Sequence, residues 1–268
     1  SGLYPPGSIF KTITGKAFFD INGTESDLSY TCAGEIQVDD YKIRCFNQTV
    51  HGEEDLLNAF ADSCNTYFVN MGEKIGAENL RKTGDHLLFN KALPIDMEHS
   101  KSQLLTSKKT VDTELGATYI GQGKTLVTPI HMAMLVTSIA NEGFLMKPYI
   151  IDYSKDKKDH IKTKNLPQYV TQIMSPEDAN RLEKMMVQVV ENGTGYKAKV
   201  EGMYVGGKTG TAQNETDKDH SWFIGFAGQQ NADISMAIIV ENAGKDISAS
   251  TIANKIIQEY KNLGYTKE

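Results

Sequence analysis

The chain has 268 residues and a formal net charge of −6, with 40% hydrophobic and 23% charged residues. A chain of this length and composition can bury a sizeable core, which excludes a disordered or low-complexity protein. The negative charge argues against a nucleic-acid partner, because nucleic-acid-binding proteins usually present a basic face.

The first half of the chain is expected to be mainly helical. After a Pro-Pro-Gly turn, apolar residues at helical spacing share one face of a first helix, and they are Phe10, Ile13, Ala17 and Phe18. Residues 20–52 are polar and show no clear period. Residues 52–76 indicate a helix, a short break and a second helix.

Two later helices have clear end signals. Thr128 can cap the first of them, with Pro129 at its first helical position and Gly143 after its end. Ser175 and Gly193 take the corresponding places at the two ends of the second helix.

No membrane-spanning segment is expected in the sequence. The longest apolar stretch, residues 132–140, is far shorter than the roughly 18 residues that cross a bilayer. The chain opens with SGLYPPGS, which is not a signal peptide. These features predict a cytosolic protein or a piece of a longer one.

The last third of the chain changes period and is expected to form a sheet. Residues 203–213, 220–228 and 234–242 are short runs with β-branched and aromatic residues, and they indicate consecutive antiparallel strands. Residues 248–264 predict a closing amphipathic helix, with Ile252, Ile256, Ile257 and Tyr260 pointing inward. The order of elements predicts a mixed sheet covered by helices, with a helical insert before the strands.

Ser8 and Lys11 form a Ser-x-x-Lys motif in the first helix. Residues three apart lie on one helical face, so the lysine amine can reach the serine hydroxyl. A lysine held among apolar residues loses part of its preference for the charged form and can then accept the serine proton. About one such match is expected by chance in a chain of this length, and Ser154 with Lys157 is a second match in a solvated run of charges.

Lys-Thr-Gly occurs twice in the chain. The copy at residues 82–84 follows a helical stretch, and its glycine is expected to end that helix. The copy formed by Lys208, Thr209 and Gly210 lies in a predicted strand, where small neighbours leave the strand edge open to a ligand backbone. A lysine and the hydroxyls of Thr209 and Thr211 can bind a carboxylate, so we interpret this second copy as the functional one.

Ser63, Cys64 and Asn65 form a Ser-x-Asn motif, although Ser63 also suits a helix cap. The order of the three motifs distinguishes them from chance matches. Ser-x-x-Lys, then Ser-x-Asn, then Lys-Thr-Gly on a strand is the signature of penicillin-recognising serine enzymes.

The chain resembles the transpeptidase domain of a monofunctional, class B penicillin-binding protein. The blocks that carry the resemblance over nearly the whole chain are YPPGSIFKT, HGEEDLLNAFADSCNTYF, IGQGKTLVTPIHMAMLVTSIANEG and VGGKTGTAQ with HSWFIGFAG. The resemblance implies an α/β, penicillin-binding or serine β-lactamase-like fold, in which helices cover an antiparallel sheet. It implies one domain over residues 1–268, with an all-helical subdomain inserted at about residues 20–165.

The resemblance also implies a role for each motif residue. Ser8 is the nucleophile that forms the acyl-enzyme, and Lys11 is the base that activates it. Ser63 relays a proton to the leaving amine, and Asn65 holds the substrate amide. Lys208 lines the pocket from the strand.

The substrate that the resemblance implies is a peptidoglycan stem peptide ending in D-Ala-D-Ala. Thr209 and Thr211 bind its terminal carboxylate beside Gly210, and the backbone N–H groups of Ser8 and Thr211 hold the oxyanion. The amine of a second stem accepts the acyl group, and β-lactams acylate Ser8 as mimics of the peptide. The acyl transfer needs no cofactor.

Members of this family have a strand and a helix before the catalytic serine, preceded by a non-catalytic module and a membrane helix. Only seven residues precede Ser8, so these parts are expected to be absent from this chain. The resemblance places the domain on the extracytoplasmic face of the bacterial membrane and implies a membrane glycosyltransferase as partner.

The three cysteines lie close together in the sequence and accompany a histidine. Cys32, Cys45, His51 and Cys64 supply three thiolates and one imidazole, the donor set of a closed tetrahedral zinc site. Some elongation-type relatives carry a metal at matching positions, which supports a structural zinc. The alternative is that Cys64 is a small buried helix residue and His51 a polar loop residue. Three cysteines cannot all pair, so a disulfide framework explains them poorly.

Other activities share these motifs. A serine β-lactamase would need an additional base, for which Glu114 is a candidate by position only. A D,D-carboxypeptidase differs in using water as the acceptor. A non-turnover penicillin sensor would keep the same residues, and turnover of a stem peptide separates it from an enzyme.

Overall fold

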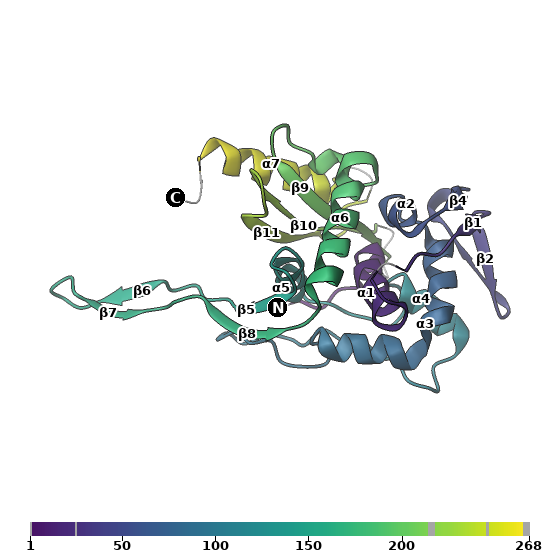
Figure 1. Ribbon diagram of the computed structural model, residues 1–268, viewed down its shortest axis with the longest axis horizontal. Coiled ribbons are helices and arrows are strands. Elements are labelled where there is room, and N and C mark those ends of the chain that lie inside the picture. Colours follow the sequence, from purple (N-terminus) through teal and green to yellow (C-terminus); the bar gives the residue numbers. More distant parts are fainter. Residues whose placement is uncertain (1, 25, 214–217, 245–246, 265–268) are drawn as a thin grey trace.

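The computed structural model describes residues 2–24, 26–213, 218–244 and 247–264 (Figure 1). Its helices are α1 (Lys11–Asn22), α2 (Leu56–Ala61), α3 (Asn65–His86), α4 (Asp112–Tyr119), α5 (Pro129–Ile139), α6 (Pro176–Asn192) and α7 (Ala249–Asn262). Short 3₁₀ turns are η1 (Gly7–Phe10), η2 (Phe46–Gln48) and η3 (Tyr196–Ala198). Within the described part of the chain, no helix has both the length and the apolar character that crossing a bilayer requires.

Three antiparallel strands form the sheet around which the core is built. In spatial order they are β11 (Ile234–Val240), β10 (His220–Gly228) and β9 (Tyr204–Ala212). Alternate residues of a strand point to opposite faces. Trp222, Ile224 and Phe226 of β10 therefore join the main core with α1, α5 and α6, whereas Phe223 and Ala227 join the cluster under α7. The predicted run of three antiparallel strands is confirmed.

The closing helix α7 contacts the sheet through a narrower face than its sequence predicts. Ala249, Ala253 and Ile257 are fully buried, but Ile256, which was expected to point inward, is 43% exposed. Alanines spaced four residues apart let the helix approach the sheet closely. Ile256 is displaced by about 100° around the helix from Ile257, so it lies beside this buried stripe and faces outward.

α1 is the central helix of the molecule and lies against α3 and α6 (Figure 1). All of its residues from Lys11 to Phe19 are buried. A helix buried on every side has no solvated face for its charges, so its lysines must find partners inside the protein. Lys16 does so by pairing with Asp20 and Asp178.

The segment expected to be all-helical also contains strands. Between α1 and α2 the chain forms β1 (Tyr30–Cys32), β2 (Glu35–Val38), β3 (Tyr41–Arg44) and β4 (Gly52–Glu54), which pair as β1 with β4 and β2 with β3. Strands of three or four residues are too short to show a period of two, so this stretch reads as aperiodic in the sequence. The expectation of an all-helical subdomain is corrected accordingly.

A ribbon of four strands extends away from the body of the molecule (Figure 1). Its strands are β5 (Phe144–Lys147), β6 (Tyr153–Lys155), β7 (Ile161–Lys164) and β8 (Gln168–Gln172), paired as β5 with β8 and β6 with β7. All residues of β7 and β8 are exposed. Ser154 and Lys157, the second Ser-x-x-Lys match, belong to this ribbon and lie outside the core.

Candidate active site

Ser8 and Lys11 lie where η1 continues into α1. Lys11 Nζ and Ser8 Oγ are hydrogen-bonded over 3.1 Å. Gly7 enters this turn with a φ of +55°, and a Cβ there would lie 2.3 Å from the carbonyl oxygen of Thr211 on β9. Only glycine fits a left-handed backbone pressed against a strand, so Gly7 sets Ser8 at the edge of the sheet.

Lys11 connects the first motif to the second. Its Nζ donates to the carbonyl oxygen of Ser63 and to Asn65 Oδ1, each over 2.7 Å. It also lies 3.1 Å from Ser63 Oγ, a hydroxyl that can accept from the ammonium or donate to the free amine. The side chain is fully buried, with Nζ 5.6 Å from the centre of the Phe68 ring. Burial lowers the pKa of Lys11 to about 7. A large share of this lysine is therefore the free amine at neutral pH, as a base for Ser8 requires.

Ser63 follows α2 in an uncommon backbone conformation, with a φ of +58°. Its N–H donates to the carbonyl oxygen of Phe60, and the N–H of Cys64 donates to that of Ala59. A non-glycine residue in this region costs on the order of 1 kcal/mol and persists where the surrounding structure holds it. The tight turn brings the Ser63 hydroxyl between two lysines.

Lys208 reaches the same hydroxyl from the sheet. Its Nζ lies 2.9 Å from Ser63 Oγ and 5.5 Å from the centre of the Phe60 ring. The side chain is fully buried. Burial, and then the positive charge of Lys11, lower the pKa of Lys208. The two amines and the hydroxyls of Ser63 and Ser8 form a continuous path along which a proton can move.

The five residues expected to be catalytic thus meet in one hydrogen-bonded group, which comprises Ser8, Lys11, Ser63, Asn65 and Lys208. The rest of the strand motif follows at the edge of the sheet. Thr209 Oγ1 donates to Thr194 Oγ1 over 2.8 Å, and Thr211 is exposed. A Cβ at Gly210 would lie 3.0 Å from the carbonyl oxygen of Pro6, so this strand packs directly against the segment that leads to Ser8.

The other Lys-Thr-Gly copy, at residues 82–84, lies within α3 and away from this group. Thr83 is buried, and its hydroxyl donates to Asp20. Contrary to expectation, Gly84 does not end the helix, which continues to His86. The glycine is explained by packing, because a Cβ there would lie 2.5 Å from Leu104 Cδ2.

Sequence reasoning missed three residues that shape the site. The Gly121 carbonyl accepts a hydrogen bond from the N–H of Gly7, and Trp222 Nε1 donates to the carbonyl oxygen of Pro5. Thr194 accepts the hydrogen bond from Thr209 described above. Gly121 and Trp222 belong to the sequence blocks that carry the family resemblance, whereas no local pattern marks Thr194.

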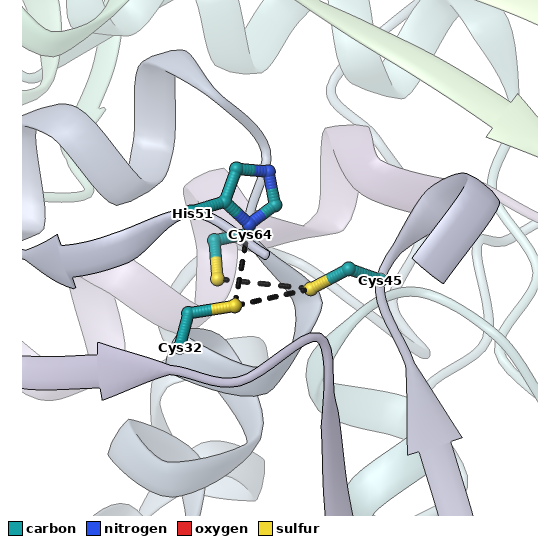
Figure 2. A group of neighbouring side chains, drawn as sticks. All are labelled: Cys32, Cys45, His51 and Cys64. Carbon is teal, nitrogen blue, oxygen red and sulfur yellow. Dashed lines mark hydrogen bonds between the residues drawn. The ribbon is translucent and has the colours of Figure 1, made fainter. Parts of the chain in front are cut away.

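The cysteines and the histidine converge on one point, as Figure 2 shows. The ligand atoms of Cys32, Cys45, His51 and Cys64 all lie within 4.8 Å of one another. The Cys45 sulfur is 3.7 Å from that of Cys32 and 3.8 Å from that of Cys64, and Cys32 Sγ is 3.3 Å from His51 Nδ1. A tetrahedral zinc with bonds of about 2.3 Å would hold its sulfurs about 3.8 Å apart. The donor set and its spacing therefore fit this metal.

The cysteine cluster contacts the second motif by two routes. Cys64 is itself the residue between Ser63 and Asn65. The Asn65 amide also donates from Nδ2 to the carbonyl oxygen of Arg44 over 2.8 Å, and Arg44 directly precedes Cys45. The backbone of Asn65 is thus fixed by its neighbour Cys64, and its side-chain amide is fixed by the segment that carries Cys45.

Comparison with known proteins agrees with this geometry. A family model described as penicillin binding protein transpeptidase domain matches residues 1–259. The chain belongs to this family. The resemblance to class B transpeptidase domains that the sequence indicated is confirmed.

This transpeptidase-family chain is 31% identical, over 93% of its length, to the peptidoglycan D,D-transpeptidase PbpA of Mycolicibacterium smegmatis, and covers 52% of that protein. It is 32% identical to the stage V sporulation protein D of Bacillus subtilis, with 97% of this chain and 43% of that protein covered. The chain therefore spans about half the length of the curated relatives it matches.

Solved structures confirm the predicted penicillin-binding fold. The D,D-transpeptidase domain of a peptidoglycan glycosyltransferase from Eggerthella lenta matches with a TM-score of 0.89 at 27% identity, covering 99% of this chain and 67% of that one. The imipenem acyl-enzyme complex of penicillin-binding protein A from M. tuberculosis matches with a TM-score of 0.87 at 28% identity, covering 97% and 60%.

Proposed function

We propose that this chain is the catalytic domain of a serine D,D-transpeptidase that cross-links peptidoglycan stem peptides through an acyl-enzyme on Ser8. The observation that carries the proposal is the buried Lys11 amine, which lies within hydrogen-bond reach of Ser8, Ser63 and Asn65 at once. Such an arrangement activates a serine without a separate histidine. Acyl transfer in this family needs no cofactor.

In the proposed acylation, the free amine of Lys11 takes the Ser8 proton while Ser8 Oγ attacks the carbonyl carbon of the penultimate D-Ala. The negative oxygen that forms lies between the N–H groups of Ser8 and Thr211, where fixed donors stabilise it. The peptide bond then breaks, and the terminal D-Ala leaves as an amine that receives a proton through Ser63. An ester on Ser8 remains.

In the proposed second half, the amine of another stem attacks the ester carbonyl. That amine loses a proton to the Lys11 and Ser63 group, the ester bond breaks, and Ser8 Oγ regains its proton. Asn65 holds the substrate amide and Lys208 supplies positive charge from the strand. The hydroxyls of Thr209 and Thr211 bind the terminal carboxylate beside Gly210.

β-Lactams are proposed to acylate the same serine. One relative, penicillin-binding protein A from M. tuberculosis, is known as acyl-enzyme complexes with penicillin G, imipenem and ceftriaxone, and these structures are 27% or 28% identical to this chain. The alternative of a β-lactamase finds little support, because no hydrogen bond among the described residues joins Glu114, its candidate base, to Ser8 or Lys11, and its carboxylate instead pairs with Lys124 at 3.0 Å.

The proposal extends to the setting of the domain. Residues 1–268 are proposed to form one transpeptidase domain, with a subdomain inserted at about residues 20–165. The full-length protein is proposed to include a membrane anchor. The domain would then act on the extracytoplasmic face of the bacterial membrane, where a membrane glycosyltransferase supplies the glycan strands.

Cys32, Cys45, His51 and Cys64 are proposed to hold a structural zinc. Support comes from their convergence, and from the backbone N–H of Gly34, which lies 3.4 Å from Cys32 Sγ and stabilises a thiolate there. Bound zinc would take all four positions of the tetrahedron and leave none for substrate. Its effect would be to hold Cys64, and hence the turn between Ser63 and Asn65, in place.

The test is a native mass spectrum before and after incubation with benzylpenicillin, with Ser8→Ala as control. We expect one stable adduct on the wild-type chain and none on the variant. An adduct that disappears with release of opened penicillin would indicate a β-lactamase. Incubation with a D-Ala-D-Ala peptide and an amine acceptor then separates the remaining alternatives: a cross-linked product indicates a transpeptidase, a shortened peptide alone a carboxypeptidase, and neither product a sensor.

A further inference from the structure

Thr194 lies between the two sides of the site and belongs to none of the three motifs. It follows α6 in the sequence ENGTG. Its backbone N–H and its hydroxyl both donate to the carbonyl oxygen of Ala61, over 3.1 and 3.2 Å. Its oxygen accepts the hydroxyl of Thr209 over 2.8 Å. One threonine thus bonds to the end of α2 and to the functional strand.

Gly193, the residue before Thr194, packs directly against the backbone of Ala61. A Cβ at Gly193 would lie 2.5 Å from the Ala61 carbonyl oxygen, so only glycine allows the contact. Ala61 ends α2, two residues before Ser63. Fixing Ala61 therefore fixes the start of the turn that carries the Ser63 hydroxyl.

The direction of the hydrogen bonds matters for Thr209. Because the Thr194 proton is engaged with Ala61, its oxygen is left as an acceptor, and this holds the Thr209 oxygen in one place. When the Thr209 proton turns to an arriving carboxylate, the Thr194 hydroxyl can turn from Ala61 and donate to the Thr209 oxygen, while the backbone N–H of Thr194 keeps its bond to Ala61. No side-chain carbon has to move, so little ordering cost remains when substrate binds.

We infer that Thr194 is a positioning residue for acyl transfer, which acts by holding the Thr209 hydroxyl and by setting the separation of the Ser63 turn from the Lys208 strand. The inference rests on the proposed function and deepens it. The same gap is spanned by the hydrogen bond of Lys208 Nζ to Ser63 Oγ at 2.9 Å, which depends on that separation.

The experiment measures acylation by benzylpenicillin in stopped flow, separating the binding constant from the acylation step. Thr194→Val keeps the shape and the backbone bond to Ala61 but lacks the hydroxyl. We expect it to lower the acylation efficiency about tenfold, as loss of one well-placed hydrogen bond does, and mainly to weaken binding. Thr194→Ser should stay within about twofold of wild type because it keeps the hydroxyl.

A double-mutant cycle with Thr209→Val provides the readout that a purely structural role would not move. If Thr194 acts through Thr209, the double variant should be little worse than Thr209→Val alone. Multiplying effects, or a Thr194→Ser variant as impaired as Thr194→Val, would overturn the inference. Thr163→Val, which removes a comparable Thr–Ser hydroxyl contact on the distant ribbon, is the matched control and should leave acylation unchanged.

The two proposals fail separately. If the wild-type chain takes no adduct, the proposed function fails. The double-mutant cycle of Thr194→Val and Thr209→Val can then be measured on the dissociation constant of benzylpenicillin, by calorimetry. Coupling between Thr194 and Thr209 in that constant would still support the positioning role. Independent effects, or no binding by any of the folded proteins, would overturn it.

Discussion

The rate of acylation should depend on pH through Lys11. Burial lowers the pKa of this lysine from its ordinary 10.5 to about 7, which corresponds to about 5 kcal/mol in favour of the neutral amine. The base in the proposed step is the neutral form. The fraction of competent enzyme is then about one tenth at pH 6, one half at pH 7 and nine tenths at pH 8.

The assay is the pseudo-first-order rate of benzylpenicillin acylation between pH 5.5 and 9, followed by intact mass at fixed ionic strength. We expect the rate to rise about fivefold from pH 6 to pH 7 and to level off above pH 8. A rate that is flat from pH 5.5 to 7, or that rises only near pH 10, would refute the assignment of Lys11 as a buried base. Lys11→Arg, which stays charged, should be inactive at every pH.

The same lowered pKa has a consequence for stability. Between about pH 7 and pH 10.5 the unfolded chain holds a proton on Lys11 that the folded chain has released. The free energy of unfolding therefore rises with pH across that window, by up to about 1.4 kcal/mol per pH unit from this group, and it falls again as the pH is lowered toward 7. Lys208 acts in the same direction. Denaturant unfolding at pH 7 and pH 9 measures this effect. The free energy of unfolding should rise more between the two pH values in the wild type than in Lys11→Met, which has no amine to titrate.

Three further outcomes are expected. Ser8→Ala should take no penicillin adduct in intact mass spectra and should shift the melting temperature by less than about 2 °C; a full adduct would move the nucleophile elsewhere. Gly7→Ala should cost at least about 2 kcal/mol in chemical denaturation and slow acylation, because its Cβ would meet the Thr211 carbonyl at 2.3 Å; wild-type values would contradict the close approach of the strand. Cys64→Ser should lose zinc in elemental analysis and more than about 2 kcal/mol of stability, whereas full acylation and stability in this variant would argue against a structural metal.

Much of the candidate site was accessible from the sequence because its parts are local. Ser8 and Lys11 are one helical turn apart, Ser63 and Asn65 flank a single residue, and Lys208 starts a short motif on a strand. The starts of two helices could be predicted for the same reason, since the side chains of Thr128 and Ser175 do cap their helices by accepting hydrogen bonds from backbone N–H groups. The four candidate metal ligands were proposed from residue type, and the structure brings them together.

What only the tertiary structure decided concerns contacts between distant segments. Lys11 bonds to residues more than fifty positions away, and Thr194 joins Ala61 to Thr209. These bonds depend on how α1, α2 and β9 pack, and no local periodicity encodes that packing. The short strands between α1 and α2 and the outward turn of Ile256 were missed because they are set by neighbouring elements. Local spacing determines which groups are available, whereas burial and long-range packing determine which of them meet and how readily they ionise.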